Sequence, residues 1–301
     1  MNSNLSGPRA LLIAGPTASG KSALALRIAR ERGATLVNAD SMQVYRDLRV
    51  LTARPPVEEE RLAPHLLFGE IDGAENFSVG RYEARAREIL ARVAGAIVFV
   101  GGTGLYFRAL TQGLSEMPAV PDEIRARVRE SAVGRETPAL HENLARVDPA
   151  SAARLRPSDR QRILRALEVH AASGRSLSEF QRQRGEPALR AGEWRGLFLA
   201  PEREALKRRI AERFAVMLQM GALAEVAALA ARGLDPALPI MRAHGAPHLM
   251  AHLRGEMSLE AAAALGVRDT KAYAKRQFTW ARHQLPDFTW IAPEDAARAL
   301  G

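Results

Sequence analysis

A short glycine-rich segment carries the clearest chemical signal in the sequence. Residues 15–22 read GPTASGKS and match the P-loop pattern G-x-x-x-x-G-K-[ST], between an apolar run and a segment of helical periodicity. Gly15 and Gly20 permit turns that aim backbone N–H groups inward, and these amides with the helix N-terminus hold an anionic phosphate. Lys21 adds a positive charge, and the Ser22 hydroxyl can ligate Mg²⁺. The pattern predicts a phosphate or diphosphate site, without saying which ligand, formed by Gly15, Pro16, Thr17, Ala18, Ser19, Gly20, Lys21 and Ser22.

An aspartate follows the next apolar run. Asp40 lies in NADSMQVYRDL, two positions after the run at 34–38, and α/β proteins bind ligands where such strands end. The carboxylate could ligate Mg²⁺ or act as a general base for an incoming nucleophile. It could equally cap the turn that follows it. The run at 96–102 ends in glycines and Thr103 rather than in a carboxylate, which disfavours an ordinary ATPase.

The hydrophobic pattern predicts the scaffold that positions these residues. Apolar runs at 9–14, 34–38, 96–102 and 194–200 predict strands, separated by helical segments such as 78–93, with Ser78 as N-cap, 201–218 and most of 258–284. Alternating strands and helices predict an α/β fold with a parallel sheet core flanked by helices. Short helical stretches without a strand occupy 118–190. We therefore expect a core in two parts, 1–117 and 191–301, around an all-helical insertion at 118–190.

Composition narrows the class of protein. The 301 residues include no cysteine, which excludes disulfides, thiolate zinc sites and cysteine nucleophiles. No apolar run is long enough for a transmembrane span, and no signal-peptide pattern opens the chain, so we expect a cytoplasmic protein. Lys and Arg number 43 against 34 Asp and Glu, and almost all the excess is arginine. That balance favours a polyanionic partner such as nucleic acid, or reflects a genome that prefers arginine codons.

Six blocks in order carry a family resemblance: GPTASGKS, NADSMQVYRDL, TARP, GGTGLYFRAL, QRILRALEVHAASGRSLSEF and AKRQFTWAR. Together they resemble the tRNA dimethylallyltransferases, also called tRNA isopentenyltransferases, over about 9–284. The resemblance implies a P-loop NTPase-like core and transfer of a dimethylallyl group from dimethylallyl diphosphate to N6 of the adenosine next to the anticodon, at tRNA position 37. It implies that the P-loop holds the diphosphate with Mg²⁺ near Ser22, and that Asp40 accepts or orients the N6 proton. Thr103 would lie beside the base, and Arg213 would stabilise the leaving diphosphate.

The resemblance also implies an RNA-binding face that receives the anticodon stem-loop. Arg162 and Arg165 are three apart and share a helix face, and basic residues alternate with aromatic ones near 275–282. A single arginine is often only a solvated surface charge. Aromatic residues such as Phe278 and Trp280 pack in a protein core more often than they stack on RNA bases. The expected tRNA contacts are Asp40, Ser41, Met42, Gln43, Thr103, Gln161, Arg162, Ile163, Leu164, Arg165, Arg242, Lys275, Arg276, Gln277, Phe278, Trp280 and Arg282.

One segment departs from the family pattern. Many members carry a Gly-Tyr-basic triplet where this chain has Gly245, Ala246 and Pro247, so contacts from those side chains cannot be transferred. His244 and His248 are candidate replacements, or they are ordinary buried or surface histidines.

Two other functions fit part of the sequence. A P-loop kinase of a small metabolite would share the P-loop and Asp40 and would use ATP, but it leaves the block around 274–282 unused. A non-catalytic RNA-binding module is disfavoured by the intact Lys21, Ser22 and Asp40. We expect a monomeric enzyme with no membrane association.

Overall fold

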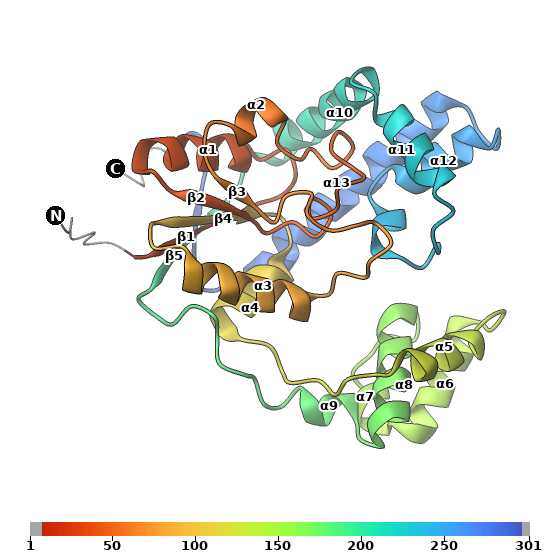
Figure 1. Ribbon diagram of the computed structural model, residues 1–301. Coiled ribbons are helices and arrows are strands. Elements are labelled where there is room, and N and C mark those ends of the chain that lie inside the picture. The colour runs from red at the N-terminus through yellow and green to blue at the C-terminus, as the bar shows by residue number, and fades with distance from the viewer. Residues whose placement is uncertain (1–7, 297–301) are drawn as a thin grey trace. The chain divides into compact units, whose positions relative to one another are not determined.

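The chain folds into two compact units, each with its own hydrophobic core. The structure is a computed structural model that describes residues 8–296, drawn in Figure 1. One unit combines the chain up to Thr111 with the chain from Ala188 onward, and the other is Gln112–Pro187. The sequence pattern predicts a helical insertion at 118–190, and the structural unit begins six residues before this range and ends three residues before its end.

A six-stranded parallel sheet with the strand order β3-β2-β4-β1-β5-β6 forms the centre of the larger unit. Its register pairs Ala14, the last residue of the β1 strand, with Gly101 on one neighbour and Phe198 on the other. The P-loop and the turn at 102–104 therefore leave the sheet side by side. The strands are β1 Ala10–Ala14, β2 Thr35–Asn38, β3 His65–Leu66, β4 Ile97–Gly101, β5 Trp194–Leu199 and β6 Phe288–Ile291.

Helices cover both faces of this sheet (Figure 1). Alternate strand residues point to opposite sides, so each face presents apolar side chains that pack against helices. Leu12, Val37 and Phe99 belong to the core cluster shared with helices α3 and α4, and Ile13 and Leu36 belong to the cluster shared with α1. The helical segments of this unit are α1 Lys21–Arg32, α2 Val57–Glu60, α3 Val79–Arg92, α4 Gly104–Gln112, α10 Arg203–Gln219, α11 Ala222–Ala231, η1 Pro239–Arg242, α12 Ala246–Leu253 and α13 Leu259–Gln284.

The smaller unit consists of helices around an aliphatic core. Leu140, Leu144 and Ile163 are among its fully buried side chains. Its two ends run side by side, because the Gly185 N–H donates to the Leu114 carbonyl at 2.7 Å. Just outside this unit, the Leu189 N–H donates to the Leu110 carbonyl at 2.8 Å. The helices are α5 Asp122–Glu130, α6 Thr137–Val147, α7 Pro149–Ala152, α8 Arg160–Ser173 and α9 Leu177–Phe180.

The predicted strands and long helices are present, and Ser78 caps α3 by accepting a hydrogen bond from the Arg81 N–H. The sequence pattern did not predict β3, which has two residues, or β6, which lies at the sheet edge and is only partly buried. It also missed α12, which starts after Gly245 at a φ of 91°. Within residues 8–296 no single helix is long and apolar enough to cross a membrane; the bent pair α10 and α11 passes that test only as two joined halves.

Candidate active site

The P-loop turns tightly between β1 and α1. Gly20 precedes the helix at a φ of 88°, a conformation that glycine adopts without strain, and Ala18 also has a positive φ of 60°. Ser19 is 1% exposed, and its Oγ has no hydrogen-bond partner among the residues that the structure describes. A buried polar atom without a partner costs free energy. The unpaired hydroxyl inside this turn is therefore suited to an anionic oxygen of a ligand.

Lys21 supplies the positive charge of the loop from a buried position. Its Nζ donates to the Pro16 carbonyl at 3.2 Å, and its residue is 8% exposed. Burial lowers the pKa of Lys21 to about 8, although the Asp40 carboxylate opposes this, and the Arg213 guanidinium on α10 lowers it further. The lysine thus stays mostly protonated at neutral pH, and a diphosphate beside it would stabilise the charged form.

Asp40 is held rigidly where β2 ends. Asn38 is fully buried; its Oδ1 accepts from the Asp40 N–H at 2.8 Å and its Nδ2 donates to the Asp40 carbonyl at 2.9 Å. Asp40 Oδ1 accepts from the Met42 N–H at 3.0 Å, so one oxygen does cap the following turn. The other, Oδ2, faces Gly102, where a Cβ would lie 3.3 Å from it. The carboxylate therefore combines a structural bond with a second oxygen directed at the adjacent glycine turn.

Three hydroxyl groups meet beside this carboxylate. Thr103 Oγ1 accepts from the Ser41 N–H at 2.9 Å and donates to Ser41 Oγ at 3.2 Å. The Tyr273 hydroxyl reaches in from α13, close enough to Thr103 and Asp40 for both to affect its pKa. Burial raises the pKa of the Tyr273 hydroxyl, and Asp40 raises it further, so this group remains a donor. The structure thus brings Asp40, Ser41 and Thr103 together from the ends of two neighbouring strands.

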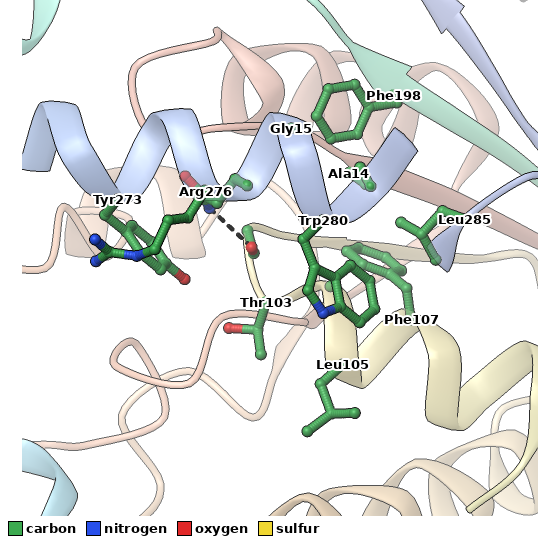
Figure 2. A pocket seen from close by; sticks show the side chains of 14 residues that line it. Ala14, Gly15, Thr103, Leu105, Phe107, Phe198, Tyr273, Arg276, Trp280 and Leu285 are labelled. Atoms are coloured by element: carbon green, nitrogen blue, oxygen red, sulfur yellow. Dashed lines mark hydrogen bonds between the residues drawn. The ribbon is translucent and has the colours of Figure 1, made fainter. Parts of the chain in front are cut away.

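An apolar cavity of about 250 Å³ opens next to these groups. Gly15 and Thr103 border it at the strand ends, and Trp280, Phe107 and Leu105 supply large apolar walls (Figure 2). The Trp280 ring packs directly on Gly104, where any Cβ would overlap it. A phosphate cradle, a carboxylate with hydroxyl neighbours and an apolar cavity therefore meet at one edge of the sheet.

Comparison with known proteins identifies the family. The model of the IPP transferase family matches residues 43–284, and an isopentenyl transferase model matches 8–63. A tRNA dimethylallyltransferase of Methylocella silvestris is 64% identical over 290 residues, which cover 95% of this chain and 96% of that protein. The chain belongs to the tRNA dimethylallyltransferase family. It is a prenyl transferase that acts on tRNA.

Other relatives agree with this tRNA dimethylallyltransferase assignment. The enzyme of Beijerinckia indica is 61% identical, covering 95% of this chain and 96% of that one. The crystal structure of a Staphylococcus epidermidis tRNA isopentenylpyrophosphate transferase superposes with a TM-score of 0.66 at 29% identity, covering 95% of this chain and 94% of that one. A eukaryotic dimethylallyltransferase captured acting on tRNA gives a TM-score of 0.77 at 25% identity, covering 95% and 74% of the two chains.

Three of the side chains expected to contact tRNA make contacts within the protein. Gln277 accepts from the Thr17 N–H at 3.3 Å and donates to the Gly102 carbonyl at 2.8 Å, tying α13 to the P-loop and to the end of β4. Gln43 Nε2 donates to two carbonyls of its own loop, at 2.9 and 3.0 Å. Phe278 packs against Phe198 and Trp290. These bonds and ring contacts engage the three side chains within the protein, and their contacts with tRNA stay predictions.

Basic residues on α13 and at the end of η1 lie on the surface. Lys275, Arg276 and Arg282 are exposed, and so is Arg242. The Arg276 guanidinium lies over the Tyr273 ring at 5.6 Å, which places it beside the cavity. These positions are compatible with the sequence prediction, whose contacts with tRNA stay predictions.

In the helical unit, the residues from Gln161 to Arg165 divide between surface and core. Gln161 and Arg162 are exposed, and Arg165 is partly exposed with its guanidinium 3.7 Å from the buried Glu168 carboxylate. Ile163 is fully buried in the helical core, and its predicted contact with RNA stays a prediction. Leu164 is half-buried against the same core.

The two histidines near the family's Gly-Tyr-basic triplet have different surroundings. The His244 ring lies 4.4 Å from the Tyr273 ring, and burial lowers the pKa of His244, as does Arg276. His248 Nε2 is bonded to Asp269 at 2.8 Å on α13. His244 thus borders the site, whereas His248 belongs to a tie between α12 and α13.

Sequence reasoning missed Asn38 and Tyr273 as site residues. Asn38 was visible as a polar residue inside an apolar run, two positions before Asp40, which is the spacing of a side chain that closes a local turn. Tyr273 had no local signal, because its neighbours Thr103 and His244 are distant in sequence.

Proposed function

We propose that the protein transfers the dimethylallyl group of dimethylallyl diphosphate to N6 of adenosine 37 in tRNA and releases diphosphate. N6 attacks the allylic carbon, the bond from that carbon to the diphosphate oxygen breaks, and one N6 proton leaves to a base. The observation that carries the proposal is the position of Asp40 beside Lys21 of the P-loop, with its Oδ2 facing Gly102 and with Thr103 lining the apolar cavity. Family membership supports the reaction class.

On the donor side, the backbone amides of the P-loop and Lys21 would bind the diphosphate and stabilise the charge that develops as it departs. Arg213 is close enough to affect the pKa of Lys21 and would assist from α10. The large apolar walls of the cavity match the chemistry of a branched hydrocarbon chain.

Mg²⁺ is a cofactor that the donor chemistry favours. Residues 8–296 contain no group of three His, Asp or Glu side chains placed to hold a metal. Mg²⁺ commonly uses one or two protein oxygens together with substrate phosphates and water, so Ser22 and the diphosphate oxygens fit this requirement. When bound, Mg²⁺ would neutralise charge on the leaving diphosphate.

On the acceptor side, Asp40 would accept the N6 proton. An exocyclic amine is a poor nucleophile, and a positioned general base contributes roughly 10²–10⁴-fold to such a reaction. The hydroxyl cluster of Thr103, Ser41 and Tyr273 would orient the base. The adenine must leave its stack to reach this site, and protein contacts must offset the unstacking energy.

The RNA contacts would come from two basic surfaces. Lys275, Arg276 and Arg282 on α13 would meet phosphates near the target base, and Arg242 would extend this surface. Gln161, Arg162 and Arg165 of the helical unit would hold the anticodon stem-loop. We also expect a monomer working in the cytoplasm, where its tRNA substrate is found; light scattering tests the oligomeric state.

The deciding experiment is a transfer assay with labelled dimethylallyl diphosphate and unmodified tRNA, comparing the wild type with Asp40→Asn. We expect label on adenosine with the wild type, and at least a hundredfold loss with the variant while both substrates still bind, because the amide cannot take the proton. No transfer to adenosine, with ATP turnover in its place, would refute the proposal. Replacing adenosine 37 by guanosine in the tRNA must abolish labelling if the position is assigned correctly.

A further inference from the structure

The segment that follows Asp40 is held by a carboxylate from a distant helix. Residues 41–55 form successive turns without a helix or strand. Glu225, in the first turn of α11, accepts hydrogen bonds from three consecutive backbone N–H groups of this segment. The donors are Arg49 at 2.5 Å, Val50 at 2.9 Å and Leu51 at 2.9 Å. Three amides converging on one carboxylate define the position of the segment, since a carboxylate has only acceptors to offer.

The held turn is connected to Asp40 by short steps. Gln43 Nε2 donates to the carbonyls of Thr52 and Ala53 at 2.9 and 3.0 Å, which closes the segment on itself. The Met42 N–H donates to Asp40 Oδ1, and Ser41 is bonded to Thr103. A shift of the amides held by Glu225 would therefore move residues 41–43.

The end of α11 holds the preceding part of the loop as well. Arg232, which follows α11 directly, is paired with Asp47 and with Asp72, the latter at 2.7 Å. Asp47 Oδ2 also accepts from the Gly73 N–H at 2.8 Å. Helix α11 thus fixes the segment from both of its ends, and Glu225 supplies the bonds nearest to the turn at 49–51.

The donor side is fixed by other contacts. The Thr17 N–H is bonded to Gln277 of α13, and Lys21 is bonded within its own loop. Neither depends on Glu225. The geometry therefore separates a donor site anchored on α13 from an acceptor segment anchored on α11.

We propose that Glu225 is a positioning residue for the tRNA substrate, which keeps segment 41–55 in the arrangement that receives the target base. This inference rests on the proposed function, in which residues 40–43 meet the tRNA. Glutamine at this position would turn an N–H donor toward backbone donors, so the segment would leave its bound arrangement part of the time. If it occupies that arrangement one tenth of the time, the KM for tRNA rises about tenfold.

The test compares Glu225→Gln with Glu256→Gln, a matched change at an exposed glutamate that pairs with the nearby Arg254 on the surface. Steady-state transfer is measured against each substrate separately. We expect E225Q to raise the KM for tRNA about tenfold while the KM for dimethylallyl diphosphate changes less than about twofold. E256Q leaves both values unchanged. Equal rises in both KM values, or no rise in either, would overturn the inference.

Amide hydrogen exchange provides a readout independent of activity. In the wild type, the Arg49, Val50 and Leu51 amides should be protected, and in E225Q they should exchange faster while the strand amides stay protected. Unchanged protection at these amides in E225Q would overturn the inference.

If E225Q does not fold, the KM values are measured for Glu225→Asp instead. Aspartate keeps the negative charge, but its carboxylate is one methylene farther from the three amides. A raised KM for tRNA alone supports the proposal, and an unchanged one overturns it. A wild type without transfer activity would instead refute the proposed function.

Discussion

Gln277 provides a sharp test of the site, because the sequence suggested that it contacts tRNA and the structure places it inside the protein. Replacing it with methionine keeps a similar volume and removes both hydrogen bonds, from the Thr17 N–H at 3.3 Å and to the Gly102 carbonyl at 2.8 Å. The Gly102 carbonyl would lose its partner in a buried setting, which costs about 1–3 kcal/mol, and the longer bond to Thr17 would add about 0.5 kcal/mol. We therefore expect Gln277→Met to lower the unfolding free energy by roughly 1.5–3.5 kcal/mol.

That loss corresponds to a fall in Tm of roughly 5–10 °C for a unit of this size. Because the bond to Thr17 fixes the P-loop, affinity for dimethylallyl diphosphate should also fall, and the KM for tRNA should change less. Thermal melting and donor titration measure both effects, with Gln219→Met as the control at an exposed position at the end of α10. A normal Tm and normal donor affinity combined with a raised KM for tRNA would show that Gln277 contacts the RNA, and would refute the assignment made from the structure.

Three further predictions follow from buried or crowded positions. Raising the pH through about 8 should weaken the binding of dimethylallyl diphosphate, because Lys21 loses its charge. The folded pKa of Lys21 lies below its unfolded value, so the free protein should become more stable as the pH rises from 8 to 10.5. If the Lys21→Met variant showed the same pH dependence of donor binding and stability as the wild type, this prediction would be contradicted. Gly104→Ala should reduce transfer at least tenfold, since the new methyl overlaps the Trp280 ring; partial recovery in the double variant with Trp280→Ala is the check, and full activity of the single variant would count against it. Ile163→Ala should destabilise the helical unit by about 2–4 kcal/mol, which melting curves measure. Arg162→Ala should leave the stability of this unit within about 0.5 kcal/mol of the wild type. The same Arg162→Ala change should reduce the salt dependence of tRNA binding by roughly one phosphate contact, which salt titrations measure.

The local parts of the site were predictable from the sequence. The P-loop is a continuous segment, and Asp40 and Thr103 each follow a buried strand directly, so their meeting depends only on the parallel sheet. The parallel register then brings the two strand ends together without any further information.

The interior ties were not predictable in the same way. Gln277 lies 260 positions from Thr17, and Glu225 binds backbone amides that have no side-chain signature in the sequence. For Ile163, the sequence did contain a signal of burial. Ile163, Ala166 and Leu167 recur at helical spacing and are all buried, which separates them from Gln161 and Arg162 on the outer face. The helical period of this block therefore indicates that Ile163 is a core residue.

The paired chain ends of the helical unit have a consequence for how such enzymes diversify. The chain leaves the sheet-containing unit near Leu110 and returns at Leu189, and these two residues are hydrogen-bonded to each other through their backbones. A segment whose entry and exit coincide can be lengthened, shortened or exchanged without moving any strand of the sheet. Transplanting residues 112–187 between relatives should therefore yield chimaeras that retain the same transfer chemistry and differ in the RNAs that they accept.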